Sequence, residues 1–207
     1  MAKRMPIRLL LIVTGSTLRA EEKDRPLAYY LKQRIEKSLI DIEEQDRKLD
    51  SGSRAVAGKE SSDSGAAGVK LSGIQVRVVA DFRWIHDDLL QGIPTISLGG
   101  PGVNSLAHRW LEDVPISLEV NDRYFIQMDP DLEEPRVSIW GMDNASTQIA
   151  ISVFAERFLT RFLDRCAAMP PMDFDPDESQ VDDEEDDDGE FEEDESDDED
   201  EDEDDDD

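Results

Sequence analysis

The chain has 207 residues, and its 52 Asp and Glu against 22 Lys and Arg give a formal net charge of −30 at pH 7. The charge is unevenly placed, because 27 of the acidic residues lie within residues 173–207, which contain no Lys or Arg. A field of this sign repels phosphate, which excludes a nucleic-acid-binding protein that neutralises phosphates and argues against docking on an anionic membrane. We therefore expect neither nucleic acid nor membrane as a partner.

The remaining body is close to neutral and of a size that suits one folded domain. We predict a single α/β domain over residues 1–170 and a disordered polyacidic tail over 171–207. One cysteine, Cys166, excludes an intrachain disulfide. The apolar run 9–13 is shorter than a signal-peptide core, and no stretch approaches the ~18 apolar residues of a membrane span. The expected location is cytoplasmic.

The N-terminal half predicts one strand and one helix. An apolar run over 7–13, closed by a Thr-Gly-Ser-Thr turn, is typical of a buried strand. Leu27, Leu31, Ile35 and Leu39 recur at a spacing of four, which predicts an amphipathic helix that starts near Pro26. Residues 50–73 contain almost no large apolar side chain, and we interpret them as a flexible insertion within the domain.

Further strands are predicted over 74–79, 94–98, 116–120, 124–128 and 137–140. Helical spacing returns over 103–111, and a long amphipathic helix is predicted over 149–163, with Pro170 and Pro171 stopping any continuation. This alternation predicts an α/β three-layer sandwich with a mainly parallel sheet and an antiparallel edge hairpin, followed by the disordered acidic C-terminal tail.

Four of the predicted strands end in glycine-rich or polar sequence. The carboxyl ends of parallel strands share one sheet edge, where open α/β sheets bind ligands. We therefore predict a ligand-binding site at that edge. Its candidate residues are Thr14, Gly15, Ser16, Thr17, Arg19, Asp81, Arg83, Gly99, Gly100, Gly102, Asn104, His108, Gly141 and Asp143.

Each strand-end motif has two interpretations. The loop 99–102 between a strand and a helix presents N–H groups that attract phosphate or carboxylate, but it lacks the spacing of dinucleotide binders and the Lys of a P-loop, so a tight packing turn is the alternative. The hydroxyl-rich turn 14–17 suits an anionic group or a sugar, and equally suits helix capping. Capping is favoured for the turn that begins at Asp143.

No cofactor and no metal site is predicted. The acidic loop 129–134 lacks the glycine and the twelve-residue frame of an EF-hand, and no His and Cys cluster has zinc spacing. His86 and His108 are candidates for acid–base work, although an ordinary surface or half-buried histidine is the favoured interpretation of both.

The leading hypothesis for function is a non-catalytic binding or interaction protein that holds a small anionic or sugar-like ligand, or a partner segment, at the strand ends. The alternative is an enzyme acting on a nucleotide or phosphosugar through Ser16, Asp81, Arg83, His108 and the glycine loop. The acidic tail solubilises the chain or attracts a basic protein or polyamine.

Residues 93–155 resemble the C-terminal α/β region of archaeal surface-layer-type proteins. The resemblance rests on the run 95–104 with its Gly-Gly-Pro and Asn, on the run 137–143 with its Gly and an Asp two residues on, and on Thr147 before an Ala-containing helix. It implies a shared fold module and no catalytic residues.

The composition of the tail generates the first prediction. Spermine should bind the full chain weakly at low salt, because its cationic amines meet the dense negative charge of residues 173–207. Isothermal titration should show that this binding disappears near 1 M NaCl, where the Debye length is about 3 Å. Binding that persists there would contradict a purely electrostatic attraction.

Overall fold

The computed structural model describes residues 8–54, 73–120 and 123–171. In chain order the elements of these ranges are β1 (Arg8–Thr14), α1 (Leu18–Arg54), β2 (Ile74–Ala80), α2 (Asp81–Ile85), α3 (Asp88–Gln91), β3 (Thr95–Leu98), α4 (Ser105–Arg109), β4 (Ile116–Val120), β5 (Tyr124–Met128), β6 (Arg136–Gly141), α5 (Asn144–Arg157) and α6 (Leu159–Ala168).

The described strands form one six-stranded sheet in the order β2-β1-β3-β6-β5-β4. Strands β2, β1, β3 and β6 pair in parallel, while β5 runs antiparallel to β6 and β4 antiparallel to β5. The α/β class and the mainly parallel sheet with an antiparallel edge hairpin are confirmed. The parallel strands end at Thr14, Ala80, Leu98 and Gly141, so these four ends share one edge.

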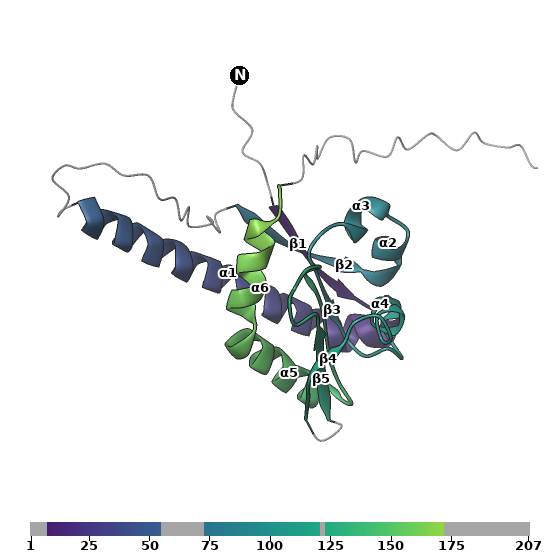
Figure 1. Cartoon of the computed structure of the whole chain (residues 1–207). Coiled ribbons are helices and arrows are strands. Elements are labelled where there is room, and N and C mark those ends of the chain that lie inside the picture. The colour runs from purple at the N-terminus through teal and green to yellow at the C-terminus, as the bar shows by residue number, and fades with distance from the viewer. Residues whose placement is uncertain (1–7, 55–72, 121–122, 172–207) are drawn as a thin grey trace, which may run out of the picture. The chain divides into compact units, whose positions relative to one another are not determined.

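Helices lie on both sides of this sheet (Figure 1). On one side, Leu10, Ile12, Ile96 and Ile139 face α1, α5 and α6 in a continuous apolar core. The helices contribute apolar side chains at helical spacing: Leu27, Leu31, Ile35 and Leu39 from α1, Ile151 and Phe154 from α5, and Phe162 and Leu163 from α6. This core also holds Cys166, and burial raises the pKa of its thiol to about 12, so the thiol stays protonated and unreactive at neutral pH.

The opposite side of the sheet is more polar, because short helices and loops cover it. Trp84 of α2 and Trp110, directly after α4, pack edge to face with ring centroids 5.5 Å apart. The Trp84 indole N–H donates to Thr95 Oγ1 at 3.2 Å, and Gln127 donates to the carbonyl of Val114 at 3.1 Å. These buried polar groups on this side of the sheet therefore have hydrogen-bond partners, as burial requires.

The first helix starts earlier than predicted. Helix α1 begins at Leu18 and passes through Pro26, which lies in the interior of the helix. Pro26 is exposed, and it has no N–H to donate to the carbonyl of Glu22 one turn earlier. The apolar stripe continues towards the N-terminus through the buried Ala20 and Asp24, a small and a charged residue that conceal it in the sequence.

The predicted flexible insertion also requires correction. Helix α1 continues to Arg54, so residues 50–54 are helical, while 55–72 lie outside the described residues. The predicted tail lies almost entirely outside them as well. Within the ranges that the structure describes, no helix is both long and apolar enough to cross a membrane.

Other helices differ in extent from the predictions. The segment after β2, which the sequence predicted as a polar strand end, forms the short helices α2 and α3. Helix α4 covers five residues, fewer than predicted. The final helix is two helices, because the backbone leaves helical geometry at Phe158, with φ −122° and ψ −23°. This break lets Phe154 and Phe162 meet edge to face with ring centroids 6.0 Å apart.

Helix α5 offers a matched test of the apolar core. Ile151→Ala should lower the free energy of unfolding by about 2–5 kcal/mol, because Ile151 is fully buried and its removal leaves a cavity. Ile149→Ala, on the same helix but 53% exposed, should change it by about 0.5 kcal/mol or less. Urea unfolding measures both, and equal losses in the two variants would contradict this packing.

Candidate functional site

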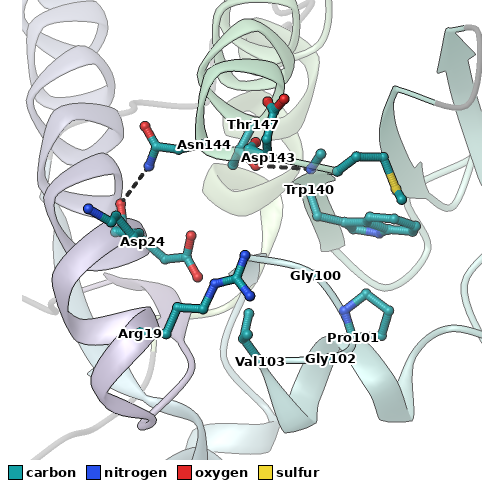
Figure 2. Close-up of a pocket in the computed structure, with 13 residues that line it drawn as sticks. Arg19, Asp24, Gly100, Pro101, Gly102, Val103, Trp140, Asp143, Asn144 and Thr147 are labelled. Carbon is teal, nitrogen blue, oxygen red and sulfur yellow. Dashed lines mark hydrogen bonds between the residues drawn. The ribbon is translucent and has the colours of Figure 1, made fainter.

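The strand-end edge contains a pocket of about 510 Å³. It opens between the first turns of α1, the β3–α4 loop and the β6–α5 turn (Figure 2). Its lining consists of Arg19, Lys23, Asp24, Gly100, Pro101, Gly102, Val103, Trp140, Gly141, Met142, Asp143, Asn144 and Thr147.

Two glycines let the walls of this pocket approach each other closely. A methyl group on Gly15 would lie 1.8 Å from the carbonyl oxygen of Val103, so the β1–α1 turn touches the β3–α4 loop directly. A methyl group on Gly141 would lie 2.5 Å from the backbone nitrogen of Thr147. A larger residue at Gly15 would push the β1–α1 turn away from the β3–α4 loop, and one at Gly141 would push the end of β6 away from the first turn of α5.

Asn104 joins three elements behind the pocket. Its side-chain nitrogen lies 3.1 Å from the carbonyl of Val13 in β1 and 2.9 Å from the carbonyl of Leu98 in β3. Its side-chain oxygen accepts from the backbone N–H groups of Leu106 and Ala107, which caps α4. Because Asn104 is buried and its amide is engaged on both sides, it positions the loop and does not face a ligand.

Asp81, directly after β2, also joins separate elements of the fold. Its carboxylate accepts from the backbone N–H groups of Ser105 and Phe82, each at 2.8 Å, so it ties α4 to the start of α2. Burial raises the pKa of Asp81, but hydrogen bonds from Ser105, Ser16 and Phe82 outweigh burial and hold that pKa below its usual value. Asp81 is therefore an ionised structural group.

Capping explains the two remaining polar turns. Thr17 Oγ1 accepts from the backbone N–H of Ala20 at 3.2 Å and so caps α1. Asp143 and Ser146 form a reciprocal capping box at the start of α5. The backbone hydrogen bond from Ser146 lowers the pKa of Asp143, which keeps this exposed carboxylate ionised beside the pocket. The favoured capping interpretation of the Asp143 turn is confirmed, and capping is also what the structure shows at Thr17.

The charged wall of the pocket comes from the first two turns of α1. Arg19 and Asp24 both extend into the pocket (Figure 2), while Lys23 is exposed beside them. Burial raises the pKa of Asp24, and the positive charge of Arg19 acts in the opposite direction. Asn144 donates to the backbone carbonyl of Lys23 at 3.0 Å, which links α5 to α1 across the pocket.

The opposite wall is aromatic. The ring of Trp140 stacks on Phe125 with centroids 4.1 Å apart, and its indole N–H donates to Gln127 Oε1 at 3.2 Å. These two contacts hold the indole in one orientation. A methyl group on Gly100 would lie 3.8 Å from the ring, so the glycine loop runs alongside it.

The predicted site residues fall into three groups. Five of them line the pocket: Arg19, Gly100, Gly102, Gly141 and Asp143. Seven lie at the same strand ends without lining it: Thr14, Gly15, Ser16, Thr17, Asp81, Gly99 and Asn104. Arg83 and His108 are exposed on α2 and α4 and line no part of the pocket, so the structure does not bring them into the site.

Sequence reasoning missed four side chains that give the pocket its chemistry, namely Lys23, Asp24, Trp140 and Asn144. A signal for Asp24 existed, because it occupies a buried position of α1 three residues before Leu27. A charged residue at a core position of an amphipathic helix requires a partner or a function. Trp140 ends a predicted strand, which also placed it at the ligand-binding edge.

Comparisons with protein-family models, curated proteins and solved structures return no match to this chain. Within the part of the chain that the structure describes, no three His, Cys, Asp or Glu side chains gather closely enough to hold a metal ion.

Asp81 generates a prediction about acid stability. Asp81→Asn should destabilise the protein at pH 7, because one of two acceptor oxygens becomes a donor facing N–H groups. A carboxylate whose pKa is lowered on folding contributes stability above its unfolded value, near 3.8, and that contribution is lost as the pH falls through the lower folded pKa. The difference in unfolding free energy between wild type and variant should therefore shrink below about pH 4.

Urea unfolding between pH 7 and pH 2.5 measures this difference. Asp41→Asn, on the exposed face of α1, is the matched control and should unfold at the wild-type midpoint at pH 7. A difference between Asp81→Asn and wild type that stays constant down to pH 2.5 would show that the ionised carboxylate does not carry the effect.

Proposed function

We propose that this chain is a non-catalytic binding protein that holds a small anionic or sugar-like ligand in the strand-end pocket. One observation carries the proposal: segments distant in sequence place two cations, a buried carboxylate and a fixed indole around a single cavity. Small-molecule sites typically combine an aromatic wall with a few converging polar groups, in cavities of this volume.

The position of the pocket in the sheet supports this proposal. The chain passes from β1 outward to β2, and then returns to the other side of β1 to form β3. The crevice between the carboxyl ends of β1 and β3 is therefore a point where the strand order reverses, and open α/β sheets bind ligands at such points. In the three-layer sandwich that the sequence predicts, this edge is the one left uncovered by the helix layers.

The enzyme alternative receives less support from the arrangement of its residues. Of its candidate groups, Gly100 and Gly102 of the glycine loop line the pocket, whereas the side chains Ser16, Asp81, Arg83 and His108 do not. Asp81 is occupied by the N–H groups of α2 and α4. Binding without chemistry is the function that the pocket residues favour.

The tail and the surface-layer resemblance remain predictions. We propose that the polyacidic tail keeps the protein soluble or attracts basic proteins or polyamines. The resemblance of residues 93–155 to surface-layer-type proteins concerns the same glycine loop and the same β6–α5 turn that border the pocket.

A ligand screen on the full chain tests the proposal. Thermal unfolding should be recorded with phosphate, acetate, glucose, glucose 6-phosphate and glucuronate, and at least one of these probes should raise the Tm, because binding to the folded state stabilises it. Arg19→Gln should weaken binding of an anionic probe about tenfold, which corresponds to the loss of one charge-assisted hydrogen bond.

Lys37→Gln is the control, because it removes one positive charge from the same helix about 27 Å from Arg19 along the axis. It is exposed and should leave affinity unchanged. No Tm shift with any probe, or equal losses in the Arg19 and Lys37 variants, would contradict a specific site in this pocket.

A further inference from the structure

We propose that the ligand of this pocket is an acidic sugar: a pyranose whose carboxylate meets Arg19, whose hydroxyls donate to Asp24, and whose ring packs against Trp140. This inference rests on the proposed binding function and names the chemical class of the ligand. It follows from three side chains that surround the cavity from different sides (Figure 2).

Asp24 supplies the central argument. The residue is only 8% exposed, lines the pocket, and receives no hydrogen bond from any described residue. The carboxylate oxygens of Asp24 are accessible, because Ser138 Oγ is the one buried side-chain polar atom without a hydrogen-bond partner among the described residues. A partly desolvated carboxylate gains free energy when donors reach it. The cavity is the side from which donors can reach Asp24, so a bound molecule is expected to provide them.

The kind of donor follows from the neighbours of Asp24. Two oxygens of one carboxylate accept well from two adjacent hydroxyl groups, which monosaccharides carry and simple acids lack. Gly99 adjoins the carboxylate, since a methyl group there would lie 2.8 Å from its Oδ2 and Gly99 has a φ of +100°. The lack of a side chain at Gly99 therefore lets the β3–α4 loop pass close to the Asp24 carboxylate without a clash.

Arg19 supplies the acid-binding group. Its side chain is exposed at the pocket, and no described carboxylate forms an ion pair with it. A guanidinium binds a carboxylate through two parallel hydrogen bonds, and Lys23 adds a second positive charge on the same wall. A neutral sugar would leave this capacity unused.

Trp140 supplies the surface for the ring. Stacking on Phe125 and the hydrogen bond to Gln127 fix the indole before any ligand arrives, which lowers the entropy lost on binding. A flat, rigid, apolar surface beside polar groups matches the apolar C–H face of a pyranose. A nucleotide fits less well, because several phosphate charges would approach Asp24 and Asp143.

Calorimetric titration of the full chain with three related probes tests the assignment. Glucuronate carries both a carboxylate and the ring hydroxyls. Glucose has the hydroxyls without the carboxylate, and acetate has the carboxylate without the ring. Glucuronate should bind at least tenfold more tightly than glucose or acetate, since the loss of either group lowers the affinity about tenfold or more. Glycine, which presents an ammonium in place of hydroxyls, serves as a fourth probe.

Two variants test which side chain binds which group of the ligand. Asp24→Asn should weaken glucuronate and glucose about tenfold or more while leaving acetate unchanged, and Asp41→Asn, exposed on the same helix, should change nothing. Arg19→Gln should reduce glucuronate to the affinity of glucose without affecting glucose itself. Circular dichroism of each variant establishes that it is folded before it is titrated.

Equal binding of glucose and glucuronate would overturn the acid subsite. Equal binding of acetate and glucuronate, tighter binding of glycine, or an Asp24→Asn variant with wild-type affinity would overturn the hydroxyl subsite. If phosphate or glucose 6-phosphate binds through Arg19 while glucuronate does not bind, the acidic-sugar assignment is wrong and the binding function stands. If no probe binds, the proposed function itself has failed.

Discussion

The arrangement of the strand-end edge depends on one buried amide, that of Asn104. Strands β1 and β3 are neighbours in the sheet, but the chain forms β2 between them in sequence and so reaches them by separate routes. Asn104 donates to a carbonyl of each strand and accepts from the first N–H groups of α4. An apolar residue of the same size would leave several buried polar groups without partners, which is why a single side chain can determine how a loop, a helix and two strands meet.

Several polar side chains at this edge are occupied in capping the helices that begin there. Thr17, Asn104 and Asp143 each cap a helix that begins at this edge, so the caps consume polar groups that would otherwise attract a ligand. The groups left to face the cavity are those without a structural task, chiefly Arg19 and Asp24. A capping group and a binding group can share a residue type and a turn, and only their partners distinguish them.

The sequence predicted the strands and the edge of the site better than the members of the site. Short apolar runs closed by glycine are buried on both faces of a parallel sheet, so their pattern is strong. Asp24 was missed because the α1 periodicity was defined by large apolar residues from Leu27 onward, whereas Ala20 and Asp24 continue the same buried stripe. Arg83 and His108 do not line the pocket, because proximity in sequence to a strand end does not determine which way a short helix turns its side chains. That direction is decided by tertiary packing, here of Trp84 and Trp110.

Helix α1 extends from the pocket to well beyond the sheet. At 37 residues it is about 55 Å long, whereas a seven-residue strand spans about 23 Å, so the helix runs well past the sheet (Figure 1). Among the side chains of α1 that the structure describes, apolar contacts with the core extend as far as Ile42. Its first turns form the charged wall of the pocket. Leu27, Leu31 and Ile35 hold the adjoining turns of the helix on the sheet, so the wall that carries Arg19 and Asp24 is positioned by the same packing that stabilises the domain. The shape of the pocket is thus coupled to the packing of the core.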